Sequence, residues 1–172
     1  MNIQSFKSAV FPIQGKLYRL AKMMLGNDEE AEDAVQEVLL KLWLNRQNLK
    51  NYRSIEALAM IITKNQCLDK LKSAHWRKSE VGEPPDTTHS WDSPYKTTEL
   101  NDSKEILIKL MHELPEQQKL IMHLRDIEEY SYEEIEKITG LCINNIRVSL
   151  SRARKSIREQ FTKVNAYGSA GN

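Results

Sequence analysis

The apolar residues of this chain recur at intervals of three and four, the period of one face of an α-helix. In the first part of the chain they predict helices over residues 6–25, about 28–45 and about 54–77. The expected core residues of the first helix are Phe11, Leu17, Leu20, Ala21, Met24 and Leu25. Those of the second are Ala31, Ala34, Val35, Val38 and Leu42. Those of the third are Ile55, Leu58, Ile61, Ile62, Leu68 and Leu71.

Turn and cap residues separate these helices. Gly26 is expected to end the first, and Asn27 with Glu30 forms a capping-box pattern at the start of the second. Later in the chain, Ser103 is expected to cap a helix with the apolar residues Ile106, Leu107, Leu110 and Met111. Pro115 is expected as the first residue of the next helix, where its missing N–H is no loss.

Residues 130–161 predict a short helix, a tight turn and a longer basic helix. Ser131 and Glu134 have the spacing of a capping box, and Gly140 supplies the positive φ that ends a helix. The longer helix, about 143–160, buries a stripe of Ile146, Leu150, Ala153 and Ile157. Its other faces are polar and basic, and they include Ser149. Two helices joined in this way form a helix-turn-helix, which favours DNA reading over the alternative of a solvated basic helix in a bundle.

Residues 80–102 break the helical pattern with three prolines, a glycine and an acidic excess, which is typical of a linker. The sequence therefore predicts an all-α protein of two small helical domains, the C-terminal one a helix-turn-helix. The domains cover residues 1–79 and 103–163, and a polar tail covers residues 164–172.

Charge is localised rather than global. The net charge is +1, but residues 1–79 hold 13 basic and 8 acidic side chains, so the first domain and the last helix carry the basic patches. Cys67 and Cys142 do not have the spacing of a disulfide framework or metal site. No apolar run has the length of a membrane span or a signal peptide, so we expect a cytoplasmic protein.

No catalytic or cofactor motif is evident. The four histidines are scattered, and the chain has no Ser/His/Asp set, no metal-ligand spacing and no glycine-rich phosphate loop. We therefore expect neither enzymatic activity nor a cofactor or metal.

Two surfaces of the first domain are open to more than one interpretation. The polar side of the second helix, with Asp33, Gln36, Glu37 and Leu40, is either solvated or a docking surface for another protein, and composition alone favours solvent. The later half of the third helix is basic and contains Trp76, and Tyr52 precedes the helix. These residues either meet a nucleic acid or pack a helix end.

Several motifs together resemble the bacterial RNA polymerase sigma factors of the extracytoplasmic-function branch of the sigma-70 family. The likeness rests on DEEAEDAVQEVLLKLW at residues 28–43, Asn65 and Asp69 with the basic residues after them, Leu114 to Glu116, YEEI at residues 132–135 and LSRAR at residues 150–154. It covers about residues 6–162, and the order and spacing of the motifs make it specific.

The resemblance implies partners and roles. Core RNA polymerase and promoter DNA are the implied partners, and an anti-sigma factor is a further one. Polymerase binding is implied for Asp33, Gln36, Glu37 and Leu40. Melting of the minus-ten element is implied for Asn51, Tyr52, Arg53, Lys64, Asn65, Asp69, Lys72 and Trp76. Reading of the minus-thirty-five element is implied for Asn144, Asn145, Arg147, Val148, Ser151, Arg152, Arg154 and Lys155.

The chain departs from the family at two places. Leu58, Ala59 and Ile61 stand where a Trp-Leu pair and an Arg are common. Cys142 stands where a Ser or Thr cap is usual, so that Asn144 or Asn145 is an alternative cap.

Two alternative functions remain open from the sequence alone. One is a self-sufficient dimeric helix-turn-helix regulator whose N-terminal domain senses a ligand or dimerises. The other is an interaction module whose basic helix binds an acidic partner.

Overall fold

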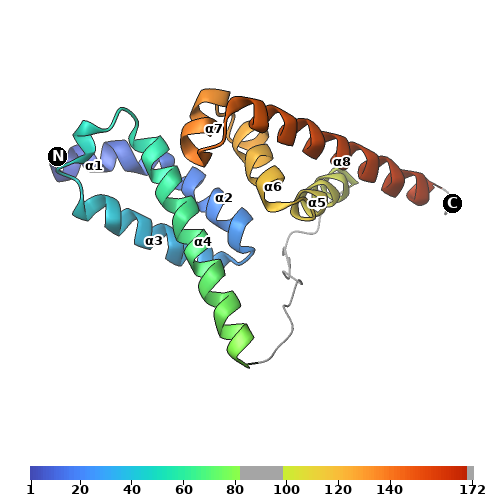
Figure 1. The fold of residues 1–172 in the computed structure, drawn as a ribbon, viewed down its shortest axis with the longest axis horizontal. Helices are drawn as coiled ribbons and strands as arrows, with labels where there is room; N and C mark the ends of the chain where they lie inside the picture. The colour runs from blue at the N-terminus through green and yellow to red at the C-terminus, as the bar shows by residue number, and fades with distance from the viewer. Residues whose placement is uncertain (82–98, 170–172) are drawn as a thin grey trace. The chain divides into compact units, whose positions relative to one another are not determined.

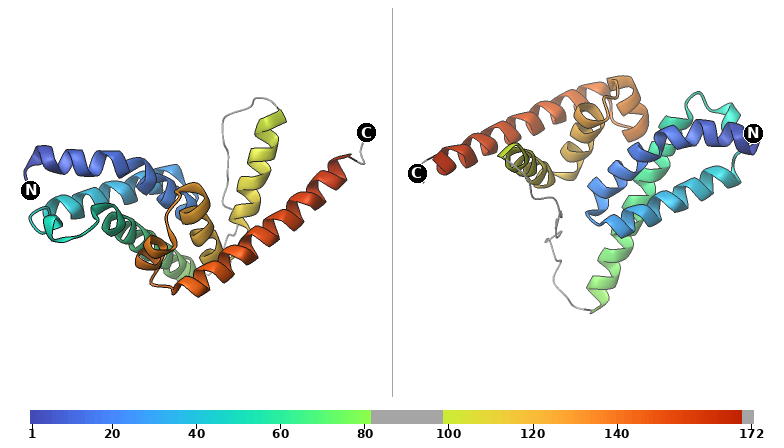
Figure 2. Two further views of the ribbon diagram at one scale, coloured as in Figure 1. Left: turned by 90° about the horizontal axis from the view of Figure 1, so that it is seen from above. Right: turned by 180° about the vertical axis from the view of Figure 1, so that it is seen from behind.

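The computed structural model describes residues 1–81 and 99–169, and every regular element in these two ranges is helical. The chain divides into two compact units, Met1–Asp92 and Ser93–Asn172, which can be followed by colour in Figures 1 and 2. The prediction of an all-α protein of two helical domains is confirmed. Residues 82–98, which hold most of the predicted linker, lie outside the described residues.

The first unit is a bundle in which α2, α3 and α4 pack against one another. Gly26 ends α2 with a φ of 70°, and Asn27 Oδ1 accepts a hydrogen bond of 3.0 Å from the Glu30 amide at the start of α3. Gly26 therefore ends α2 as predicted, and of the predicted capping box at the start of α3 the structure shows the half in which Asn27 accepts from the Glu30 amide. The elements are α1 (Ile3–Val10), the 3₁₀ turn η1 (Phe11–Ile13), α2 (Gln14–Leu25), α3 (Asp28–Leu44), the 3₁₀ turn η2 (Leu49–Asn51) and α4 (Ile55–Val81).

The start of the first unit differs from the prediction. Residues 6–25 do not form one helix, because the ring and missing N–H of Pro12 are unfavourable inside an α-helix, and η1 separates α1 from α2 there. Phe11, predicted in the core, is 58% exposed on this turn.

The core face of α4 was also predicted wrongly. Its buried side chains are those of Ala59, Met60, Thr63 and Cys67, whereas Leu68 is exposed and the other five predicted residues are half-buried. Mostly small side chains face α2 and α3, so the helices can lie close together, and the larger apolar residues flank the contact.

The second unit is built on α8, against which α5, α6 and α7 pack (Figure 1). The predicted stripe is confirmed, because Ile146, Leu150, Ala153 and Ile157 are all buried. The elements are α5 (Glu99–His112), α6 (Glu116–Met122), the π-helical turn η3 (His123–Ile127), α7 (Tyr132–Thr139) and α8 (Ile143–Ser169).

Several predicted boundaries were wrong. α5 begins at Glu99 rather than after Ser103, and α4 reaches Val81, so helix enters both ends of the predicted linker. Pro115 directly precedes α6, with an extended ψ of 143°, instead of being its first residue. α8 continues to Ser169, and residues 164–169 are therefore helical and not a tail. Leu107 on α5 is exposed rather than in the core.

Candidate functional site

The outward face of α3 carries all four residues predicted to bind polymerase. Asp33, Gln36, Glu37 and Leu40 are exposed, opposite the buried stripe of the same helix. Leu40 is 56% exposed, and Leu44, one turn further on, is 67% exposed. Leu44 was not among the predicted site residues, although its spacing of four from Leu40 places it on the same side of the helix.

A polar network holds the Glu37 carboxylate against α4. Gln66 Nε2 donates to Glu37, and Gln66 Oε1 accepts from Lys41 Nζ. Lys70 Nζ lies 3.2 Å from the other Glu37 oxygen. Glu37 is about half exposed, so these contacts add little to stability but restrict its orientation. The sequence gives no local signal for Gln66, because its partners come from a different helix.

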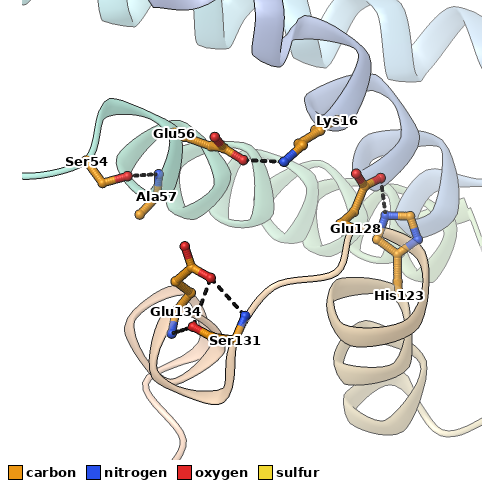
Figure 3. A network of polar contacts seen from close by, with 8 residues as sticks. All are labelled: Lys16, Ser54, Glu56, Ala57, His123, Glu128, Ser131 and Glu134. Carbon is orange, nitrogen blue, oxygen red and sulfur yellow. Dashed lines mark hydrogen bonds and ion pairs between the residues drawn. The ribbon is translucent and has the colours of Figure 1, made fainter.

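The loop before α4 exposes the aromatic side chain of Tyr52, and the backbone on both sides of this residue is held by hydrogen bonds. Leu49 in η2 is buried, and the Tyr52 amide donates to its carbonyl at 3.1 Å. Ser54 Oγ accepts from the Ala57 amide at 3.0 Å and caps α4, and Lys16 Nζ lies 2.6 Å from Glu56 (Figure 3). Asn51, Tyr52 and Arg53 are exposed between these anchors. This geometry suits a stacking site for an unpaired base.

The predicted nucleic-acid residues of α4 are spread along the helix. Asn65, Asp69 and Lys72 are exposed and recur at spacings of four and three, which places them on one face. Lys64 is half-buried, and burial lowers the pKa of its ammonium. Residues 65 and 72 lie roughly 16 and 27 Å along the helix from residue 54. This face therefore fits a segment of several nucleotides. The side chain of Trp76 lies outside the described residues.

The helix-turn-helix has the local geometry that the sequence predicted. Ser131 Oγ accepts from the Glu134 amide at 3.2 Å, and the Glu134 carboxylate accepts from the Ser131 amide at 2.8 Å (Figure 3). Gly140 ends α7 with a φ of 74°. Asn144 and Asn145 are the second and third residues of α8, so neither precedes the helix as a cap, and both side chains are exposed.

All eight residues predicted to read DNA are exposed on α8, but they are not equally free to contact DNA. Arg154 is bound to Asp126 by two contacts, Nη2 to Oδ1 at 2.5 Å and Nε to Oδ2 at 3.1 Å. Hydrogen bonding to Asp126 raises the pKa of Arg154. Ser149, predicted on the polar surface, is buried and its Oγ accepts from Gln117 Nε2 at 3.0 Å.

Comparison with known proteins distinguishes a sigma factor from the alternative of a self-sufficient helix-turn-helix regulator. The family description "Sigma-70 region 2" matches residues 13–77, and "Sigma-70, region 4" matches residues 104–157. The ECF RNA polymerase sigma factor SigW of Bacillus subtilis (strain 168) is 24% identical, over 91% of this chain and 89% of the relative. The RNA polymerase sigma factor SigV of the same strain is 30% identical, over 85% of this chain and 84% of the relative. The chain belongs to the extracytoplasmic-function sigma factors of the sigma-70 family.

A solved structure has the fold of this sigma factor. The sigma factor RpoE in complex with the anti-sigma factor NepR from Bartonella quintana matches with a TM-score of 0.77 and 23% identity, over 94% of this chain and 99% of that chain. Region 2 falls in the first unit and region 4 in the second. The alternative of a self-sufficient dimeric regulator is not favoured, because both sigma regions match and not only the helix-turn-helix.

Two general properties of the described residues complete the picture of this sigma factor. Within residues 1–81 and 99–169, no helix combines the length and the apolar character that crossing a membrane requires. Over the same ranges, no three His, Cys, Asp or Glu side chains come together in a way that could hold a metal ion.

Proposed function

We propose that this sigma factor binds core RNA polymerase through α3, melts the minus-ten element with the η2 loop and α4, and reads the minus-thirty-five element with α8. The observation that carries the proposal is that each unit presents most of the residues predicted for its matched sigma region on an exposed face. The protein supplies recognition, and the polymerase supplies the chemistry.

The face of α3 suits protein docking because an exposed leucine lies beside an oriented carboxylate. Leu40 and Leu44 offer apolar surface, and Glu37 is held in one direction by Gln66 and Lys70. A partner with apolar side chains ringed by basic ones would match this face.

Promoter melting follows from binding to a single strand. An extruded base that stacks on Tyr52 offsets an unstacking cost of a few kcal/mol, so opening needs no nucleotide hydrolysis. Asn65 and Lys72 then lie along the path of the separated strand, with Lys72 suited to phosphate.

Promoter reading by α8 uses two kinds of contact. Asn144, Asn145 and Arg147 lie near the start of the helix, where side chains reach base edges in a major groove. Arg152 and Lys155 are further along and suit phosphates. Arg154 is a weaker candidate, because Asp126 already accepts two of its hydrogen bonds.

The proposal includes a location and a regulator. Because the protein is proposed to act with RNA polymerase, we expect it in the cytoplasm. We also expect an anti-sigma factor to inhibit it. The support for a regulator is that the similar sigma factor RpoE was solved with the anti-sigma factor NepR.

Reconstituted transcription tests the proposal. Purified core polymerase is supplied with this chain and a pool of templates with randomised upstream sequence, and the initiated transcripts are sequenced. We expect two enriched motifs at a fixed separation, which depend on the chain. A core enzyme that neither binds the chain nor gains selectivity would refute the proposal, and selective binding of duplex DNA by a dimer of the chain alone would support the regulator instead.

A further inference from the structure

Two arginines share one aromatic ring in the helix-turn-helix unit. The guanidinium carbon of Arg147 lies 5.1 Å from the ring centroid of Tyr132, and that of Arg125 lies 4.9 Å from the same centroid. Both distances are within the roughly 6 Å over which a ring attracts a cation. The three residues belong to η3, α7 and α8, so the ring connects all three elements.

The backbone that leads into this ring is held by two hydrogen bonds. Tyr132 is the first residue of α7, directly after Ser131, whose amide is held by the Glu134 carboxylate at 2.8 Å. Arg125 Nη1 donates to the Tyr130 carbonyl at 2.7 Å, which fixes the neighbouring guanidinium as well. The half-buried ring of Tyr132 thus lies between the guanidinium of Arg125 and the exposed side chain of Arg147.

The contact orients Arg147 without using its hydrogen-bond donors. Among the residues that the structure describes, the Arg147 guanidinium meets the Tyr132 ring and no hydrogen-bond acceptor. Arg154 is the opposite case, because Asp126 occupies two of its donors. An arginine that reads guanine needs two donors in a fixed plane, and a ring contact provides the plane while leaving the donors free.

We propose that Tyr132 is a positioning residue for promoter reading, which holds Arg147 ready for bidentate contact with one base of the upstream element. This inference rests on the proposed function of α8. Preorganisation of a long side chain reduces the ordering that binding must impose, so the ring adds to discrimination between bases and not only to affinity.

The test uses holoenzymes of core polymerase with the full chain carrying Tyr132→Leu, Tyr132→Phe, Arg147→Ala, or Tyr132→Leu with Arg147→Ala. Initiation is measured on the selected promoter and on variants with each upstream position changed in turn. We expect Arg147→Ala to lose preference at one position. Tyr132→Leu should reduce preference at that same position by about three- to tenfold, and Tyr132→Phe should retain it.

The double variant should discriminate no worse than Arg147→Ala alone, because the ring acts through that arginine. A matched control pairs Tyr132→Leu with Arg152→Ala on the same helix, and here the two effects should add. Equal loss of preference at every position after Tyr132→Leu would overturn the proposal, as would additive effects with Arg147→Ala. Loss of preference in Tyr132→Phe would also overturn it, because that variant keeps the ring.

A second measurement does not depend on promoter function. The mobility of the Arg147 side chain is followed by NMR relaxation of its Nε–H group in the full chain without DNA. We expect greater mobility in Tyr132→Leu than in Tyr132→Phe, and equal mobility in the two would contradict the positioning role. Failure of the wild-type chain to select promoters would refute the proposed function separately.

Discussion

Leu40→Ala tests whether α3 is the polymerase-binding face. Burying a whole leucine side chain contributes about 1.5–3 kcal/mol. Because Leu40 is 56% exposed in the free protein, docking can bury only a little over half of it. We therefore expect Leu40→Ala to weaken binding by about 1–1.5 kcal/mol, which is a factor of about five to twelve in Kd.

The assay is a fluorescence titration of labelled chain with core polymerase, without DNA. Phe11→Ala is the matched control, because Phe11 is 58% exposed in the same unit but lies on η1 and not on α3. Neither substitution should change thermal stability appreciably, since both side chains are mainly exposed. Unchanged affinity in Leu40→Ala, or an equal loss in Phe11→Ala, would refute α3 as the docking face.

Four further predictions concern two buried side chains and one helix cap. Ile146→Ala should lower the free energy of unfolding by about 2–5 kcal/mol in urea denaturation, because Ile146 is completely buried; a loss below 1 kcal/mol would contradict this. Ser131→Ala should cost about 1 kcal/mol in the same assay, and Ser131→Asp, which keeps an N-cap acceptor, should cost less. Burial raises the pKa of the Cys67 thiol from 9.0 to about 12, so at pH 8 iodoacetamide should label exposed Cys142 and spare Cys67 until the protein unfolds. Since only the folded state keeps the Cys67 proton between pH 9 and about 12, stability should fall as pH rises through that window, and Cys67→Ala should flatten the fall.

Features set by neighbouring residues in the chain could be predicted from the sequence. The capping box at Ser131, the left-handed glycines at 26 and 140, and the buried stripe from Ile146 to Ile157 all follow from local spacing. The exposure of Leu40 and Glu37 could be predicted in the same way, because both residues lie on the side of α3 opposite its apolar stripe.

Features set by contact between helices could not be predicted. The inner face of α4 is chosen by how closely α2 and α3 approach it, so Ala59 and Thr63 are buried while Leu68 is exposed. The pairing of Arg154 with Asp126 likewise joins residues far apart in sequence. Charge alone made Arg154 and Arg152 equivalent, and only the folded structure distinguishes them.

The unbroken length of α8 has a mechanical consequence. A helix from Ile143 to Ser169 is about 40 Å long, and its start carries Asn144 and Arg147. If this helix tilted by about 5° about one end, its other end would move by about 3.5 Å, which is more than the length of a hydrogen bond. A molecule bound at the C-terminal end of α8 could therefore change promoter selectivity without contacting any residue that binds DNA.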